Sequence, residues 1–572
     1  MKKLFVYLKN YKKQCVLAPL FKMLEACFEL FIPLVVASII DVGIANGDTS
    51  YIVWCAVIMV ALGAIGLTCT LFAQYFSAYC AVGFVSSIKH GLFKHISSLS
   101  YREIDTLGTS TMITRMTSDI NQLQTGVNLT LRLFMRSPVI VFGAMIMAFI
   151  VDFKASLIFV VTIPLLTLVV FGIILSTIPL YKKVQGRLDK VMNTSRENLS
   201  GSRVIRAFGL EEQQRNKFHN ETEELNIAQR FVGRISAIMN PATYAIVNVS
   251  IAVLIWQGAI QVDHGSLTQG QVIALYNYMT QILVELIKLA NLIVTITKAV
   301  ASGNRIESVF EVEPSQASGN LKKRNESEFA VEFRNAFLRY EGSPEYTLEN
   351  ISFKVKNGES IGIIGGTGSG KTSLINMIGR FYDAEKGQVL YNGHEVKEYD
   401  LEFLREEIGL VPQKAVLFNG TVRENLKWGN KNATDEEILS AIENAQATDV
   451  LQSKSEGLDF VIEEGGKNLS GGQRQRYTIA RALVKKPSVL ILDDSASALD
   501  YATDAKLRHA ISSLDFKPTT FIVSQRTASI MGCDQIIVLD DGQIVGIGKH
   551  NDLLDSCLVY QEIYNSQFKE EK

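Results

Sequence analysis

Six long apolar stretches in the N-terminal half restrict the fold of this chain more than any other feature of its sequence. A helix needs about 20 consecutive apolar residues to cross the hydrocarbon core of a bilayer. The stretches that meet this requirement are residues 16–44, 51–84, 134–151, 156–180, 236–260 and 270–297. We therefore expect an all-α transmembrane domain of six helices, with the lipid bilayer as one partner of the chain.

Lys and Arg are distributed unequally among the connections between these stretches. Basic segments precede the first span and separate the second from the third and the fourth from the fifth, whereas "DVGIANGDTS" and "QVDHGSLTQG" contain neither residue type. Because basic loops stay in the cytoplasm, we expect both termini of this multi-pass protein to be cytoplasmic. The basic and then apolar N-terminus is expected to remain as a membrane helix rather than to be removed as a signal peptide.

The cytoplasmic connections are unusually long for loops between packed helices. Each has about 50 residues, against the 2–8 that are usual, and its apolar residues recur at helical spacing. We expect the membrane helices to extend far into the cytoplasm. Two short mixed segments within them, "TSTMITRMTSDI" (109–120) and "SGSRVIRAFGL" (200–210), are either turns at the tips of the extensions or docking elements.

Several charged side chains lie within or at the ends of the spans: Glu25, Glu29, Arg132, Arg136, Glu285 and Lys288. Charge at membrane depth is costly and normally faces a bundle interior or water. For Glu29 and Glu285, a water-filled pathway and a position near the interface both remain open. Arg132 and Arg136 are expected to lie near the interface and to extend their charged ends toward water.

The C-terminal half contains a glycine-rich phosphate loop. "SIGIIGGTGSGKTS" matches G-x-x-x-x-G-K-[ST] from Gly365 to Thr372 and follows a predicted strand. Glycines let backbone N–H groups approach phosphate, the lysine reaches the β- and γ-phosphates, and the threonine hydroxyl binds Mg²⁺. This pattern predicts an ATP and Mg²⁺ site formed by Gly365, Gly366, Thr367, Gly368, Ser369, Gly370, Lys371, Thr372 and Ser373.

A second predicted strand, "SVLILDD", ends in two adjacent acids about 120 residues later. Downstream of a phosphate loop, Asp493 is interpreted as the carboxylate that holds the Mg²⁺ shell. The next position, Asp494, is where a base or a water-orienting group would lie.

At this point the chain resembles ATP-binding cassette (ABC) proteins over essentially its whole length. "NLSGGQRQR" resembles the family signature, which implies that Leu469, Ser470, Gly471, Gly472 and Gln473 contact the ATP of a partner. The resemblance implies that Tyr340 stacks on adenine and that Gln413 contacts Mg²⁺ and senses the γ-phosphate. It also implies a type I exporter with a transmembrane domain at 1–310, a linker at 311–330, an α/β P-loop cassette at 331–572, and two coupling helices at the mixed segments.

Two positions depart from the family pattern. Asp494 stands where active sites have Glu, and Gln525 stands where they have His. Asp is one methylene shorter, about 1.5 Å, and Gln cannot carry a proton or a positive charge. Because Lys371 and the glycines are unchanged, we expect this site to bind ATP and to hydrolyse it slowly.

The predicted function is export by one half of a heterodimeric ABC exporter in a bacterial cytoplasmic membrane. The second half-transporter would supply the missing Glu and His, and amphipathic drugs or other hydrophobic small molecules would be the substrates. A homodimeric lipid or peptide exporter and an ATP-gated channel or sensor are the alternatives. A net charge of −1 gives no reason to expect a nucleic-acid partner.

Overall fold

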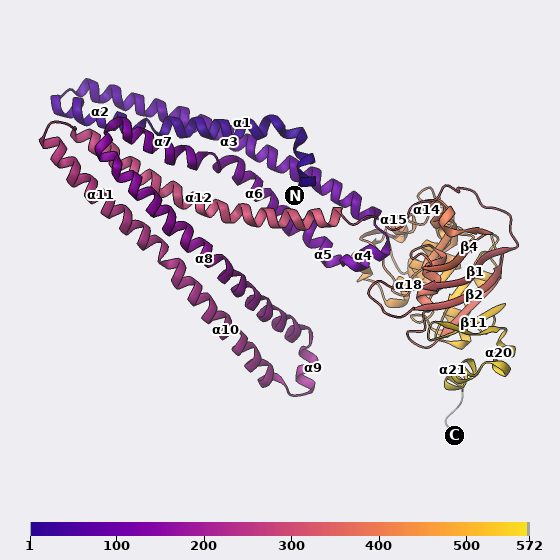
Figure 1. Cartoon of the computed structure of the whole chain (residues 1–572). Coiled ribbons are helices and arrows are strands. Elements are labelled where there is room, and N and C mark those ends of the chain that lie inside the picture. Colours follow the sequence, from indigo (N-terminus) through magenta and orange to yellow (C-terminus); the bar gives the residue numbers. More distant parts are fainter. Residues whose placement is uncertain (1, 569–572) are drawn as a thin grey trace. The chain divides into compact units, whose positions relative to one another are not determined.

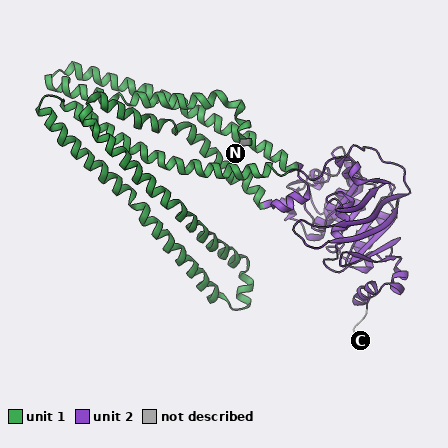
Figure 2. Cartoon of the chain, in the orientation of Figure 1, with its two compact units in different colours: residues 1–97, 110–312 green, residues 98–109, 313–572 purple. Residues whose placement is uncertain are grey.

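The computed structural model describes residues 2–568. Residue 1 and residues 569–572, the outer ends of the expected transmembrane and nucleotide-binding domains, lie outside the described residues. The chain forms two compact units, distinguished by colour in Figure 2. Unit 1 contains residues 1–97 and 110–312, and unit 2 contains residues 98–109 and 313–572.

Unit 1 is helical throughout, and its helices are far longer than a bilayer is thick (Figure 1). Among residues 2–568, six helical spans, some of them made of several consecutive elements, are long and apolar enough to cross a membrane, which confirms the predicted number of spans. Each runs for 42 to 53 residues, or about 60–80 Å at 1.5 Å per residue. The helices are therefore extended beyond the membrane-spanning length, as predicted, while the side to which they extend stays a prediction.

The elements of unit 1 follow one another as helices with short breaks between them. Their bounds are η1 (Lys2–Tyr11), α1 (Lys12–Glu29), α2 (Ile32–Ser38), η2 (Ile39–Ile44), α3 (Thr49–Ser98), α5 (Thr109–Thr114), η3 (Arg115–Asp119), α6 (Ile120–Leu133), α7 (Arg136–Val151), α8 (Phe153–Ser200), α9 (Ser202–Ala207), α10 (Glu211–Ala237), α11 (Met239–Asp263) and α12 (Gln269–Phe310).

Helix α12 holds unit 1 together because it packs against α2, α6, α7, α8 and α11. Its buried face includes Tyr278, Met279 and Ile282, none of which is measurably exposed. Helices α8 and α10 pack on each other, and the short helix α9 joins them at the far tip of the pair (Figure 1).

The expectation that Arg136 extends its charged end toward water is wrong. Only 7% of this residue is exposed, and its guanidinium forms ion pairs with Glu29 and Glu285 from α1 and α12. A buried guanidinium is tolerated because these carboxylates neutralise it. Glu285 itself is 3% exposed, so this carboxylate faces the interior of the helix bundle.

Unit 2 contains a six-stranded sheet, a four-stranded antiparallel sheet and a small two-stranded one. The six-stranded sheet has the order β12-β11-β3-β10-β9-β6 and is parallel except for β12. The strands are β1 (Phe329–Leu338), β2 (Leu348–Lys356), β3 (Ser360–Gly365), β4 (Lys386–Tyr391), β5 (His394–Glu395), β6 (Ile408–Val411), β7 (Gly420–Thr421), β8 (Val461–Ile462), β9 (Val489–Asp493), β10 (Thr519–Val523), β11 (Gln535–Asp540) and β12 (Gln543–Gly548).

Helices cover the parallel sheet, and two hydrophobic cores lie around it. The parallel strands are nearly continuous runs of Val, Ile and Leu, as is typical of a sheet buried on both faces. The helices are α4 (Tyr101–Leu107), α13 (Lys371–Ile378), η4 (Val396–Glu398), α14 (Leu401–Glu407), α15 (Val422–Leu426), α16 (Asp435–Asn444), α17 (Thr448–Gln452), η5 (Gly457–Asp459), η6 (Glu464–Gly466), α18 (Gly471–Val484), α19 (Tyr501–Ser512), η7 (Thr527–Ser529), α20 (His550–Ser556) and α21 (Leu558–Phe568).

The short helix between the second and third spans is α4, and it precedes the segment in which a docking element was expected. Residues 109–120 instead form α5, η3 and the start of α6, which continue into the third long helix. Residues 98–109 belong to unit 2, where Tyr101 packs edge-on against Phe381 with ring centroids 4.9 Å apart. At the other tip, α9 lies within the predicted segment 200–210.

Candidate nucleotide site

The phosphate loop connects β3 to α13 in unit 2. Strand β3 ends at Gly365 and α13 begins at Lys371, so the loop runs from the carboxyl end of a parallel strand to a helix N-terminus. This is the usual position of anion sites in α/β folds. Gly370 has a φ of 92°, and a Cβ there would lie 2.6 Å from Leu348, so glycine is required for both reasons.

The lysine of the loop lies against the backbone that would surround a phosphate. Its Nζ donates to the carbonyls of Gly365 at 3.0 Å and Gly366 at 2.6 Å. Burial lowers the pKa of Lys371, while the charges of Asp494 and Asp493 act in the opposite direction. A partly desolvated ammonium beside exposed loop residues is suited to bind the oxygens of a phosphate chain.

Thr372 and Asp493 meet at the end of β9. The threonine Oγ1 donates to both carboxylate oxygens, at 3.1 and 3.3 Å. Burial raises the pKa of Asp493, and the charge of Asp494 raises it further, against the opposing effects of Thr372 and Lys371. A cation at this hydroxyl–carboxylate pair would stabilise the ionised carboxylate.

These two groups fit a nucleotide-bound Mg²⁺ rather than a metal held by protein alone. No cluster of three or more His, Cys, Asp or Glu residues suited to a metal ion occurs among residues 2–568. Mg²⁺ usually takes one or two carboxylates from the protein and its remaining ligands from phosphates and water. The donors Thr372 and Asp493 match that requirement.

Tyr340, the residue expected to stack on adenine, lies beside the phosphate loop. Its hydroxyl is 2.9 Å from Ser373 Oγ in α13. Its ring meets the ring of Tyr382 edge-on, with centroids 5.0 Å apart. The structure therefore brings Tyr340, distant in sequence, next to the loop.

Asp494 is held on several sides at the position of the expected base. Its carboxylate accepts a hydrogen bond from Gln413 Nε2 at 3.3 Å, and its amide donates to the carbonyl of Val523 at 2.9 Å. Burial raises the pKa of Asp494, while Gln413, Lys371, Arg526 and the backbone of Gln525 act to lower it. Three residues far apart in the sequence, Gln413, Asp494 and Gln525, thus come together.

Gln525 presents its side chain to solvent and its backbone to the protein. The residue is exposed, and its carbonyl accepts a hydrogen bond from Gln567 at 2.7 Å. The backbone position at this site is therefore fixed by α21, whereas the side chain is free to reach a ligand. An amide in this place can donate a hydrogen bond but cannot carry the positive charge of a histidine.

The signature segment, residues 469–473, forms the N-terminus of α18. Ser470 caps the helix, and the Ser470 amide donates a hydrogen bond to Gln473 Oε1 at 2.9 Å. Leu469 is buried, whereas Gly471 is exposed and has no neighbouring atom within 4 Å of where its Cβ would lie. An anion approaching from outside this chain could therefore reach the helix N-terminus directly.

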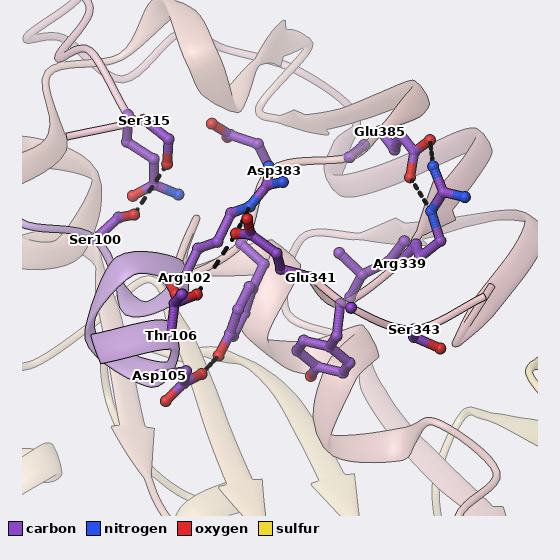
Figure 3. Close-up of a pocket in the computed structure, with 16 residues that line it drawn as sticks. Ser100, Arg102, Asp105, Thr106, Ser315, Arg339, Glu341, Ser343, Asp383 and Glu385 are labelled. Carbon is purple, nitrogen blue, oxygen red and sulfur yellow. Dashed lines mark hydrogen bonds and ion pairs between the residues drawn. The ribbon is translucent and has the colours of Figure 1, made fainter. Parts of the chain in front are cut away.

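A cavity of about 650 Å³ adjoins Tyr340 and contains residues that the sequence interpretation missed (Figure 3). Tyr382 donates to the carboxylate of Asp105 in α4, and Arg102 of the same helix pairs with Glu341 at 3.0 Å. The sequence carries a usable signal for α4, because Ser100 and Glu103 form a capping box and Gly108 ends the helix.

Comparison with known proteins identifies relatives over the whole chain. The ABC transporter transmembrane region matches residues 15–286, and the ABC transporter family matches residues 348–497. The chain is 34% identical to the uncharacterized ABC transporter ATP-binding protein YfiB of Bacillus subtilis (strain 168), with 100% of this chain and 99% of that protein covered.

Two further similarities extend over almost the same length. The chain is 28% identical to the ATP-dependent lipid A-core flippase of Escherichia coli (strain K12), covering 99% of this chain and 97% of the flippase. A solved structure of a bacterial Atm1-family ABC exporter with ATP bound superimposes with a TM-score of 0.80, covering 98% of this chain and 99% of the other at 23% identity. That structural likeness shows a shared fold.

Proposed function

Since the chain belongs to the ABC transporter family, as a type I exporter with six membrane helices ahead of one cassette, we propose that it works as one half of a heterodimer. ATP-driven export across a membrane is its activity, and a half-transporter of this kind requires a dimer partner. In this proposal, the partner contributes the Glu and the His that this chain replaces with Asp494 and Gln525.

The geometry of Asp494 is the observation that carries the proposal. A carboxylate that orients water must lie within about 2.6–3.2 Å of it, and Asp is shorter than Glu by about 1.5 Å. Asp494 cannot easily move closer to the attacking water, because two hydrogen bonds hold it in place. Its amide donates to Val523 of β10, and its carboxylate accepts from Gln413. A misplacement of about 1 Å can lower a rate on the order of 10²-fold.

Binding of ATP requires other groups, and all of them are present. Lys371 and the loop amides bind the phosphates, Thr372 and Asp493 hold Mg²⁺, and Tyr340 stacks on the base in this proposal. Mg²⁺ supplies charge neutralisation at the phosphates when it is bound. We therefore expect this chain's own site to retain ATP, while the signature segment completes the hydrolysing site of the partner.

Exposed apolar residues at the tip of unit 1 support docking onto a partner. Val204 and Phe208, in and just after α9, are 59% and 74% exposed, and Leu210 follows at 38%. Contiguous exposed apolar side chains on a helix tip commonly mark a protein interaction site. We assign this tip to the partner's nucleotide-binding domain, with both termini in the cytoplasm of a bacterial cell.

The test is the ATPase activity of the purified chain alone and of its complex with a half-transporter that has Glu after its Walker B Asp. The complex is expected to hydrolyse ATP at least about tenfold faster than the chain alone. Full ATPase activity of the chain alone would contradict the heterodimer proposal. It would favour the second candidate, a homodimeric lipid exporter, which the 28% identity to a lipid A-core flippase supports.

A further inference from the structure

The hydrogen bonding of the first membrane span is interrupted beside an ionisable residue, although Leu30 and Phe31 between α1 and α2 keep right-handed helical dihedrals. Helix α1 ends at Glu29, and α2 begins at Ile32 after two residues in a turn. Pro33 has no N–H to donate to the carbonyl four residues earlier, which is that of Glu29. The Tyr278 hydroxyl from α12 donates to the neighbouring Leu30 carbonyl at 2.7 Å, which supports the break from one side.

A local loss of hydrogen bonding is the ordinary effect of a proline within a helix. It does not mark a binding site by itself, so the side chains around it decide.

Six charged side chains gather at this break, and we refer to them as the ion cluster: Lys22, Glu25, Glu29, Arg136, Glu285 and Lys288. Arg136 of α7 lies at its centre, 2.7 Å from Glu29, 3.8 Å from Glu25 and in direct contact with Glu285. Lys288 pairs with Glu285 at 2.9 Å, and Lys22 pairs with Glu25. Three acids and three bases leave the cluster with no net charge.

The centre of the cluster lies within the depth of the hydrocarbon core, whereas Lys22 and Lys288, 22 and 19 residues from Ile44 and Gln269, lie about 28–33 Å from these ends, at or beyond its edge. Glu29, Arg136 and Glu285 are each 15 or 16 residues from the ends of their spans at Ile44, Val151 and Gln269. At 1.5 Å per residue this corresponds to about 22–24 Å, and the core is about 30 Å thick. Charges that are exposed at this depth face water or a bundle interior rather than lipid.

The cluster has a buried centre and a partly exposed edge. The side chains of Glu285, Arg136 and Lys22 are 4–9% exposed, whereas Glu29 is 35% and Lys288 is 48% exposed. The exposed edge therefore offers the Glu29 carboxylate and the Lys288 ammonium. Ion pairs with Arg136 and Glu285 link these two groups, and the buried Arg136 Nε beside them has no hydrogen-bond partner among the described residues.

We propose that this edge binds the polar head of a zwitterionic amphiphile, such as a phosphate-and-ammonium head group on an alkyl chain. The ligand's ammonium would contact the Glu29 carboxylate, and its phosphate would contact the Lys288 ammonium. This assignment rests on the exporter function proposed above and adds the substrate class to it. The exposed edge of the ion cluster would then form part of the translocation pathway.

Electrostatics favours a zwitterion over a ligand with a single charge. The cluster is neutral, so a purely cationic or anionic ligand would leave an uncompensated charge at membrane depth, which is costly. A zwitterion adds no net charge and satisfies both exposed groups. Charge-assisted contacts of this kind are the stronger class of hydrogen bonds.

The experiment uses the full-length complex in lipid nanodiscs, without ATP, and measures equilibrium binding of three radiolabelled probes that share a decyl tail. They are decylphosphocholine, decyltrimethylammonium and decyl phosphate, used below their micellar concentrations with empty nanodiscs as background. Decylphosphocholine is expected to bind at least about tenfold more tightly than either singly charged probe. Glu29→Gln and Lys288→Gln should each weaken it by about tenfold.

Matched substitutions on α10 provide the controls. Glu212→Gln and Lys217→Gln remove the same charges from exposed positions of unit 1 outside the ion cluster, and binding should stay within about twofold. Glu29→Asp and Lys288→Arg keep the charges and should retain most of the binding, which separates charge from folding defects.

Several outcomes would overturn the site. Equal binding of decyltrimethylammonium, with only Glu29→Gln having an effect, would show a cation site. Unchanged binding in both glutamine variants would show that these two groups do not contact the head group. Probe binding is measured without ATP and so does not depend on the ATPase test. Failure of the proposed function would therefore appear in the ATPase activities, whereas failure of the binding site would appear in the probe affinities.

Discussion

The signature segment and the hydrolytic position of the same cassette differ in how complete they are. Residues 469–473 form a fully capped helix N-terminus with an open approach at Gly471. At the carboxyl end of β9, Asp494 has a side chain one methylene shorter than Glu and accepts a hydrogen bond from Gln413, and Gln525 offers an uncharged amide. Under the proposed function, this difference would let one chain bind ATP, support its neighbour's chemistry and leave its own chemistry weak.

The sharpest way to break this comparison is to damage the signature segment. Ser470→Arg removes the helix cap and places a long side chain over the N-terminus, so ATPase activity of the complex should fall about 100-fold. Asp494→Ala should lower it less than about threefold. The control is Ser440→Arg on the exposed face of α16, which should be neutral. Equal losses from Ser470→Arg and Asp494→Ala would contradict the asymmetry.

A second variant tests whether this chain's own site binds ATP without hydrolysing it. Lys371→Ala removes the ammonium beside Gly365 and Gly366, and ATP affinity at this site should fall about 10–100-fold. The measurement is labelled nucleotide retained after rapid washing, with the partner's site disabled. The label should be mostly intact ATP in the parent. Lys431→Ala, at an exposed position, is the control, and recovery of mostly ADP from the parent would exclude a slow site.

Restoring the missing groups should raise hydrolysis at this chain's site. With the partner's Walker B Glu changed to Gln, Asp494→Glu together with Gln525→His should increase ATPase activity about tenfold. Because both groups act on one phosphate, each single change should recover little and the effects should not add. A double variant as slow as the parent would place the defect in the partner's signature instead.

The smallest expected effect concerns stability and pH. Burial holds the pKa of Asp494 above its ordinary value of about 3.9, so between the unfolded and folded pKa values the native state binds more protons than the unfolded chain. The stability from this group is present at low pH and is lost as pH rises through that window.

Asp494→Asn should therefore raise the apparent melting temperature at pH 7 by about 1–3 °C, measured without Mg²⁺ or nucleotide. The increase should shrink to nothing below the unfolded pKa. Asp515→Asn, at an exposed position, should show no such pH-dependent change. A constant increase at every pH would mean that ionisation of Asp494 is not its cause.

The nucleotide loop was predictable because its chemistry is local in the sequence. Strand, glycines, lysine and threonine occur within one run, and the structure forms the strand, turn and helix that this run implies. The six spans were predictable for a similar reason, since length and hydropathy decide them. Their charges were not, because Arg136 pairs with a carboxylate 149 residues away and hydropathy carries no information on such partners.

Helix α4 shows a second limit of sequence interpretation. Its 7 residues are too few to show the helical periodicity of apolar side chains, and only its capping box indicates a helix in the sequence. The docking element was therefore expected at residues 109–120, which lie directly after it. The break at Glu29 was signalled by Pro33, yet proline inside apolar helices is also tolerated without a break, as at Pro164 and Pro179 in α8.

The membership of α4 in unit 2 has a consequence for biosynthesis. Asp105 leaves the ribosome 277 residues before Tyr382, its hydrogen-bonding partner. At about 5–20 residues per second, this interval lasts about 14–55 s. During that time the last four membrane helices are made while α4 still lacks its binding surface. Translation therefore separates insertion of the membrane helices from completion of the nucleotide-binding unit, and the cassette finishes folding around a segment synthesised long before it.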